Sequence, residues 1–279
     1  MANTYPVKTF EDRYNTAHIL VEKYLNDGFL SATERDILLR IVIINYHETH
    51  KIAGAYSCDS SCHNCAFCQK MRKAAESDPT IICGYCYDHA QEIRMPSVKE
   101  AHGLTLFILS NVLFTVDDWK RRPISKKLRT EWENILRINS AGETENVTQG
   151  INYLNLLYAN PVFFGGYWGK NVPAIVSAIR TVGKPKNTRF VQSSIHINKP
   201  DKKVPEADLV FTVYDDEEEI RKALENGGCE CNGKMCAECG WKCYLPEELG
   251  GWPEGSNACE LLRLTNKKDR KKVDQALGK

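Results

Sequence analysis

Eleven of the twelve cysteines in this 279-residue chain lie in two dense groups, which makes thiol chemistry the strongest feature of the sequence. The first group consists of Cys58, Cys62, Cys65, Cys68, Cys83 and Cys86. The second group consists of Cys229, Cys231, Cys236, Cys239 and Cys243. Cysteines two residues apart are typical of metal-binding knuckles and redox sites, so each group predicts bound metal.

The first group fits two kinds of metal site. Cys62 with Cys65 and Cys83 with Cys86 match the two knuckles of a tetrahedral zinc site, because each CxxC loop turns two thiolates toward one point. Cys58-x3-Cys62-x2-Cys65 instead resembles the spacing with which radical S-adenosylmethionine (SAM) enzymes hold a four-iron cluster. In that family three cysteines bind three irons, and the fourth iron takes the amino and carboxylate groups of SAM. The spacing leaves both interpretations open.

The second group places five thiols within fifteen residues. Gly228, Gly233 and Gly240 allow the tight turns that bring backbone amides close to thiolate sulfurs. The intervening segments are too short to form a helix or strand of their own. Four of these thiols suffice for a second zinc or iron-sulfur site.

Strand-like and helix-like apolar patterns alternate from residue 134 onward. The expected strands are 135–139, 162–168, 188–195 and 207–214, and the expected helices are 147–158, 172–182 and 216–226. This alternation predicts an α/β fold, built as a complete or partial parallel (β/α) barrel with cysteine-rich metal-binding loops. Because ligands gather at the carboxyl ends of such strands, both cysteine groups are expected on one rim.

The first of these strands ends in a turn that contains candidate cofactor-binding residues. Ser140, Gly142 and Glu143 follow the apolar segment directly. The turn resembles the glycine-glycine-glutamate strand end that contacts the SAM amine in radical SAM enzymes. That resemblance implies that Glu143 and its neighbours bind SAM.

The cysteine groups and this strand end together resemble the phage and mobile-element family called gene product eighty-eight. The resemblance is carried by Cys86-Tyr87, by the strand Arg-Ile-Asn-Ser-Ala-Gly-Glu at 137–143, and by the glycine-led CxxCG tail at 232–240. It runs from about Tyr56 to Cys243. It implies a cysteine-ligated iron-sulfur protein of strand-helix architecture, encoded by a phage, plasmid or integrated element, and it implies no substrate.

The remaining segments suggest three regions. We expect a helical N-terminal region at 1–55, a cysteine-rich barrel-like domain at 56–265, and a charged C-terminal tail at 266–279. In the first region apolar residues recur at helical spacing with a break at 26–28. Ser31 followed by Glu34 resembles a capping box that starts the second helix.

Composition and charge narrow the class of partner. The chain has 37 Lys and Arg against 36 Asp and Glu, which excludes the broad attraction that polybasic proteins exert on nucleic acid. Nucleic acid stays open as a partner only through a local patch such as the basic run at 120–129. The most apolar stretch, 104–116, is too short to cross about 30 Å of hydrocarbon, and the N-terminus lacks an export-signal pattern. We expect a cytoplasmic protein with no membrane contact.

Two functions follow as alternatives. The first is an iron-sulfur protein with a 4Fe-4S cluster, radical-SAM-like, that binds SAM and acts on an unassigned substrate. The second is a zinc-stabilised binding module for nucleic acid or a protein partner, without catalysis.

Overall fold

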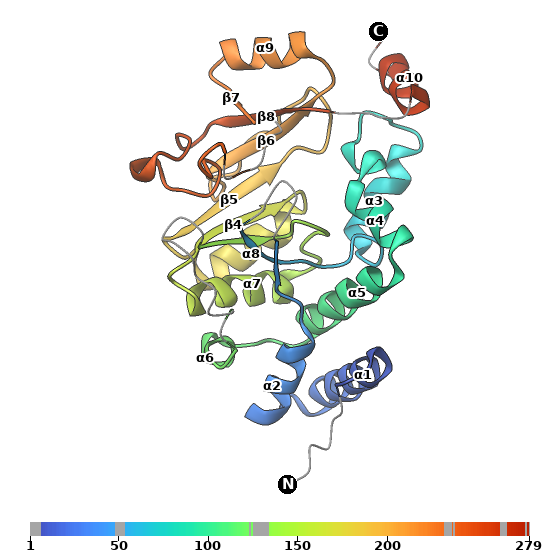
Figure 1. Ribbon diagram of the computed structural model, residues 1–279, viewed down its shortest axis with the longest axis vertical. Coiled ribbons are helices and arrows are strands. Elements are labelled where there is room, and N and C mark those ends of the chain that lie inside the picture. Colours follow the sequence, from blue (N-terminus) through green and yellow to red (C-terminus); the bar gives the residue numbers. More distant parts are fainter. Residues whose placement is uncertain are drawn as a thin grey trace.

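The computed structural model shows helices packed on one mixed sheet (Figure 1). It describes residues 7–47, 54–122, 124, 134–231, 236, 238–262, 267–276 and 278. Within these residues the sheet has eight strands in the order β1-β2-β3-β4-β5-β6-β8-β7. The strands are β1 (Asn45–Tyr46), β2 (Tyr56–Cys58), β3 (Ile135–Ile138), β4 (Phe164–Gly169), β5 (Thr188–Ser193), β6 (Leu209–Tyr214), β7 (Cys229–Glu230) and β8 (Asn257–Leu261). The predicted α/β class is confirmed.

The sheet is parallel apart from its first pair. β1 runs antiparallel to β2, and every later pair is parallel. Strands β2 to β6 follow one another in chain order, and α7 (Val147–Ala159) and α8 (Val172–Val182), which connect β3 to β4 and β4 to β5, pack together on the main core. Strand pairing in the described part of the chain runs from β1 to β7 as an open ladder, so the expected barrel is not confirmed.

Alternation along the strands gives the sheet two different faces. Ile138, Tyr167 and Phe190 pack into the main hydrophobic core. They meet there α7 (Val147–Ala159) and α8 (Val172–Val182). Neighbouring strand residues such as Trp168 and Val191 belong to a second apolar cluster, which includes Cys236 and Cys243 of the second cysteine group. Because successive side chains of a strand point to opposite faces, one sheet serves both clusters.

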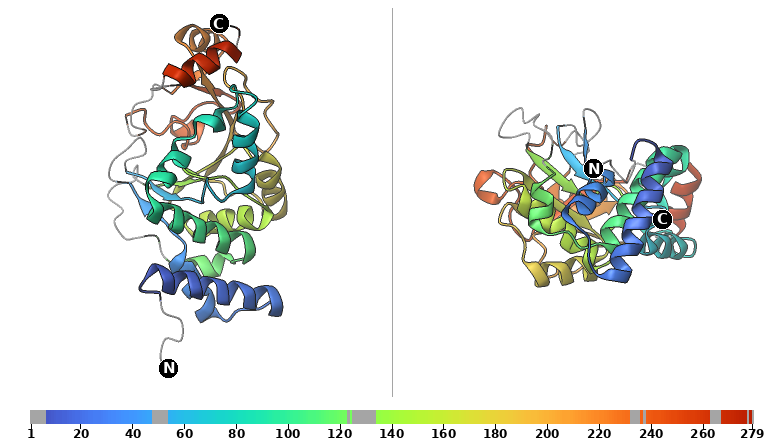
Figure 2. Two further views of the ribbon diagram at one scale, coloured as in Figure 1. Left: turned by 90° about the vertical axis from the view of Figure 1, so that its right-hand side faces the viewer. Right: turned by 90° about the horizontal axis from the view of Figure 1, so that it is seen from below.

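The other helices enclose the rest of the core. They are α1 (Phe10–Asp27), α2 (Ala32–Ile41), α3 (Ala66–Ala75), α4 (Tyr87–Arg94), α5 (Pro96–Asn111), α6 (Val116–Lys120), α9 (Glu217–Glu225) and α10 (Lys267–Ala276), with short 3-10 turns at Ile82–Tyr85 and Glu247–Leu249. Figure 2 shows α1 and α2 at one end of the molecule and α10 at the other. The two N-terminal helices pack against α5 and share the main core with the sheet.

The helix-start and helix-break predictions for the N-terminal region are confirmed. Ser31 Oγ accepts a hydrogen bond from the Glu34 amide, and the Glu34 carboxylate accepts one from the Ser31 amide. The first helix ends where Gly28 adopts φ 69°, a left-handed conformation that glycine adopts without strain. No described helix combines the length and apolar character that crossing a bilayer requires.

Part of the basic run at 120–129 has structural contacts. Arg121 pairs with Asp36 and Asp118, and Arg122 donates to the carbonyl of Val42. Residue 123 and residues 125–129 lie outside the described residues. Arg121 and Arg122 therefore attach the start of the basic run to α2 and to the residue that follows this helix.

Asn152 on α7 fixes the segment that follows α5. Its Oδ1 accepts from the Phe114 amide at 2.7 Å, and its Nδ2 donates to the carbonyls of Leu109 and Val112. Replacing Asn152 by alanine leaves three buried backbone groups without partners, and we expect a loss of about 3 kcal/mol in the free energy of unfolding. Urea denaturation measures this loss.

Asn155 provides the matched control for that experiment. Its side chain lies one turn further along α7 and donates a single hydrogen bond, to the Phe114 carbonyl at 2.8 Å. We expect Asn155→Ala to cost about 1 kcal/mol. Equal losses of unfolding free energy in the two variants would show that the additional hydrogen bonds of Asn152 do not stabilise the fold.

Candidate functional site

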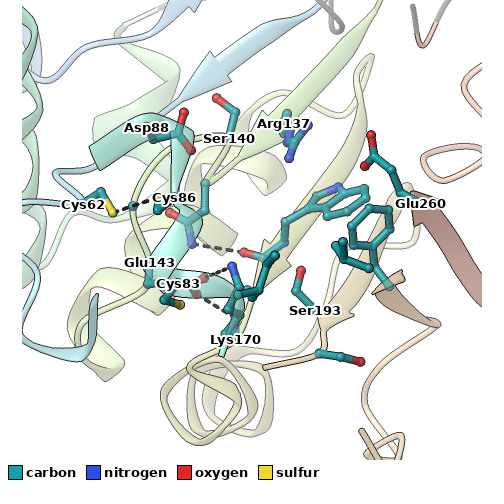
Figure 3. A pocket seen from close by; sticks show the side chains of 18 of the residues that line it. Cys62, Cys83, Cys86, Asp88, Arg137, Ser140, Glu143, Lys170, Ser193 and Glu260 are labelled. Atoms are coloured by element: carbon teal, nitrogen blue, oxygen red, sulfur yellow. Dashed lines mark hydrogen bonds and ion pairs between the residues drawn. The ribbon is translucent and has the colours of Figure 1, made fainter. Parts of the chain in front are cut away.

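One cavity of about 380 Å³ opens at the carboxyl ends of the central strands, and both cysteine groups line it. The lining thiols are Cys62, Cys68, Cys83 and Cys86 from the first group and Cys231, Cys236, Cys239 and Cys243 from the second. Figure 3 shows Cys62 and Cys86 on one side of this cavity and Glu260 on the other. The expectation of a shared rim therefore agrees with where the structure places these eight thiols.

Four thiols of the first group contact one another. The Sγ atoms of Cys62 and Cys86 are 3.3 Å apart, and the Cys68 thiol is hydrogen-bonded to those of Cys62 and Cys65. We call Cys62, Cys65, Cys68 and Cys86 the thiol cluster. Its members come from the turn before α3, from the first turn of α3 and from the residue before α4.

Cys58 is not brought to this cluster. Strand alternation places Tyr56 and Cys58 in the main core beside Ile138, and the Cys58 side chain is fully buried there. Burial in apolar surroundings raises the pKa of the Cys58 thiol. The spacing Cys58-x3-Cys62-x2-Cys65 therefore does not converge in space, whereas Cys68 and Cys86 do reach Cys62.

Cys62 has the environment of a thiolate. Hydrogen bonds from the Cys68 and Cys86 thiols hold the pKa of Cys62 well below its usual value, and the positive charge of Arg72 adds to this effect. Arg72 Nη1 lies 3.5 Å from Cys62 Sγ and donates to the Cys62 carbonyl at 2.7 Å. The thiolate is the form that binds metals and acts as a nucleophile.

The buried carboxylate of Glu92 shapes the loop that carries Cys62. It accepts hydrogen bonds from the amides of Cys62 and His63, at 3.1 and 2.7 Å, and from the Ser61 hydroxyl. His102 Nδ1 lies 3.0 Å from the same carboxylate. Burial alone would lower the pKa of His102, but the bond to Glu92 outweighs it and the pKa is raised.

The carboxyl end of β3 is pinned to the same cysteine loop. Asp59 Oδ1 accepts from the amides of Ser140 and Ala141, at 2.7 and 3.0 Å, and from the Ser140 hydroxyl. Gly142 adopts φ 76°, and a Cβ atom there would lie 2.3 Å from the Ser60 carbonyl oxygen. Only glycine permits this approach, so Ser140 and Gly142 line the cavity beside the first cysteine group.

Glu143 also lines the cavity, but its carboxylate is held by the end of β4. It accepts from the amides of Lys170 and Asn171, at 2.7 and 3.3 Å, and pairs with Lys170 Nζ at 3.4 Å (Figure 3). Burial raises the pKa of Glu143. Burial opposes the charge of Lys170, yet Glu143 and the nearby thiol of Cys83 raise its pKa.

The second cysteine group faces the cavity from the opposite side. Burial raises the pKa of Cys243, and the nearby thiols of Cys231, Cys236 and Cys239 act in the same direction. The segment is held on the sheet by aromatic packing, since the Tyr244 ring lies where a Cβ of Gly166 would be. Residues 232–235 and 237 lie outside the described part, and Cys229, on β7, is not among the lining residues.

Several lining residues were not singled out as ligands from the sequence. Arg137 on β3 stacks its guanidinium 4.6 Å from the Trp168 ring. Asp88, at the start of α4, has its pKa raised to about 7, chiefly by burial. Arg137 did have a sequence signal, because a charged residue interrupts an otherwise apolar strand. Asp59 and Glu92 had none, since their partners are far away in the chain.

The thiols are close-packed rather than converged on one point. Among the described residues, no group of three or more Cys, His, Asp or Glu side chains has the geometry of a finished metal site. A zinc ion with bonds of about 2.3 Å to sulfur holds its thiolates roughly 3.8 Å apart, which is close to the Cys62–Cys86 spacing. Thiolates are the donors that a soft metal prefers, so the chemistry of this donor set fits zinc or iron.

Comparison with protein-family models, with curated proteins and with solved structures yields no match for this chain.

The Glu92 network predicts the effect of one charge removal. Glu92→Gln replaces one carboxylate oxygen by an NH₂ group, which cannot accept a hydrogen bond. At least one N–H group of the Cys62 loop then loses its acceptor. We expect the free energy of unfolding to fall by about 2 kcal/mol. The matched control is Glu100→Gln, an exposed change on α5 that should have no measurable effect. Indistinguishable urea midpoints for the two variants would refute this role of Glu92.

Proposed function

We propose that this chain is a cysteine-ligated iron-sulfur protein that acts as a radical-SAM-like enzyme in the shared cavity. One observation supports this function above the others: two thiol groups and the Ser140–Glu143 strand end line the same cavity. A structural metal site needs no such cavity, whereas an enzyme needs room for a substrate beside its reactive group.

Three members of the thiol cluster are the proposed cluster ligands. Cys62 contacts both Cys68 and Cys86, and all three line the cavity, whereas Cys65 is fully buried and does not line it. Three protein ligands would leave one iron of a 4Fe-4S cluster open toward the cavity. When bound, such a cluster supplies the electron that cleaves the sulfonium of SAM.

The strand end supplies the proposed SAM contacts. Ser140 and Gly142 are held next to the cysteine loop by Asp59 and Ser60, so they face the space beside the proposed open iron. Glu143 is engaged by Lys170 and Asn171, and it acts by fixing the ends of β3 and β4 relative to each other. The second cysteine group is the proposed site of a second metal centre on the far wall.

Strand order supports the same proposal. The parallel pairing of β2 to β6 in chain order is compatible with the proposed partial (β/α) barrel, and such barrels bind ligands at the carboxyl ends of their strands. The resemblance to the gene product eighty-eight family belongs to this proposal, as does an origin in a phage or mobile element.

A zinc-stabilised binding module is the second candidate. The observation that favours it is the 3.3 Å separation of the Cys62 and Cys86 sulfurs, which is close to the spacing around a single zinc ion. The four members of the thiol cluster would then complete one closed tetrahedral site. In that case the cavity would serve a nucleic-acid or protein partner.

Metal analysis of matched alanine variants separates the two candidates. Protein purified without oxygen should be brown and contain iron and acid-labile sulfide. Cys62→Ala should lose about four irons per chain, because it removes a ligand of the proposed cluster. Cys58→Ala should keep its iron, since Cys58 lies in the main core. Colourless protein with stoichiometric zinc would overturn the iron-sulfur proposal.

Gly142 tests the proposed SAM contact. A Cβ at this position would collide with the Ser60 main chain and displace the strand end, so Gly142→Ala should weaken SAM binding by about tenfold. Gly227→Ala is the control, because Gly227 has a similar positive φ of 85° and open space around its Cβ position. Calorimetric titration of reconstituted protein with SAM gives both affinities. Equal affinities would argue against a SAM site at this turn.

A further inference from the structure

We infer that the substrate of this cavity is a small organic carboxylate, bound by the side chains of Arg137 and Trp168. The inference rests on the proposed function, since it names the substrate class of the same cavity.

Arg137 is placed in the cavity by its strand register. It lies on β3 opposite Gly166 of β4, on the sheet face that also carries Trp168. Gly166 has no side chain, and the Tyr244 ring and Trp168 Nε1 occupy the space above it. The guanidinium then stacks over Trp168 with 4.6 Å between its central carbon and the ring centroid. Both side chains line the cavity.

Two hydrogen-bond donors in this wall are buried and have no acceptor. They are Arg137 Nε and Trp168 Nε1, neither of which has a partner within the part of the chain that the structure describes. The Trp168 side chain is only 8% exposed, so water satisfies it poorly. Leaving a buried donor unpaired costs about 1–3 kcal/mol, and a bound acceptor would remove that cost.

The positive charge of Arg137 is not neutralised by direct contact. Burial disfavours the charge, but the summed fields of Tyr244, Cys236, Asp59 and Asp88 raise the Arg137 pKa. None of the ion pairs among the described residues includes Arg137. Asp59 is already engaged by Ser140 and Ala141. A half-buried cation whose Nε donor has no acceptor in the described residues fits an anionic ligand.

Geometry favours a carboxylate and separates it from SAM. The Nε edge of a guanidinium is flat and presents paired N–H groups, which match the two oxygens of a carboxylate. Trp168 and Phe211, whose ring centroids are 5.0 Å apart, offer apolar walls for the organic part. Arg137 lies within β3, whereas Ser140 follows the left-handed turn at Asn139 (φ 59°), so this subsite lies beside the proposed SAM contact rather than on it.

The test compares two ring compounds that differ in charge. Benzoate and benzamide have similar shape, and titration of the full-length protein by nuclear magnetic resonance measures the affinity for each. We expect benzoate to bind at least about tenfold more tightly than benzamide. Inorganic phosphate is the third probe, and it should bind more weakly than benzoate. Equal binding of benzoate and benzamide, or tighter binding of phosphate, would overturn the inference.

Variants assign the effect to the two donors. Arg137→Gln should abolish the preference for benzoate over benzamide. Trp168→Phe keeps an aromatic ring beneath the guanidinium but removes the N–H donor, and it should weaken benzoate binding severalfold. If Arg137→Gln does not fold, Trp168→Phe alone tests the inference, and unchanged benzoate binding in Trp168→Phe would contradict it. Loss of iron from Arg137→Gln with unchanged benzoate binding would assign Arg137 to the second cysteine group instead.

Failure of this inference is distinguishable from failure of the proposed function. The binding assay needs no iron and no SAM cleavage. Zinc-containing protein that still shows Arg137-dependent benzoate binding would retain the carboxylate site and reject the radical-SAM-like function. An iron-sulfur protein that binds benzoate and benzamide equally would reject the carboxylate site and leave the radical-SAM-like function standing.

Discussion

The carboxylate of Asp59 forms the contact on which the cavity depends. It lies directly after β2 and accepts two backbone amides from the turn after β3, at 2.7 and 3.0 Å. These hydrogen bonds join segments about 80 residues apart in the chain. They add to the pairing of β2 with β3, which covers only three residues of each strand. The loop with Cys62 follows Asp59, and Gly142 follows the turn, so this contact brings the thiols to the strand end.

Buried polar groups then hold each part of the wall in place. Glu92 fixes the Cys62 loop from α4, and Glu143 joins the ends of β3 and β4. Each carboxylate accepts several N–H groups, and bonds to charged acceptors are stronger than neutral ones. Two of the buried donors without acceptors in the described residues, Arg137 Nε and Trp168 Nε1, belong to residues that line the cavity. The protein therefore supplies hydrogen-bond partners for these carboxylates, whereas the two donors of the carboxylate subsite await an acceptor from a ligand.

The regular elements could be predicted because their signals are local. The helix predicted at 172–182 is α8, and the strands predicted at 135–139 and 207–214 differ from β3 and β6 only at their ends. Cys58 could not be placed this way, because β2 has only three residues and its partner lies on β3. Pairing with a distant strand decides which face a side chain takes. The same limit applies to Asp59, whose partners are set by the fold rather than by its neighbours.

The proposed function requires an iron-sulfur cluster at the edge of the cavity, held by the first cysteine group. Anomalous X-ray diffraction at the iron and zinc absorption edges, from crystals grown without oxygen, can detect it directly. We expect an iron peak next to the sulfurs of Cys62, Cys68 and Cys86, with a second metal peak beside Cys236 and Cys243. A peak at the zinc edge alone, enclosed by four sulfurs, or no anomalous signal in the cavity, would contradict it.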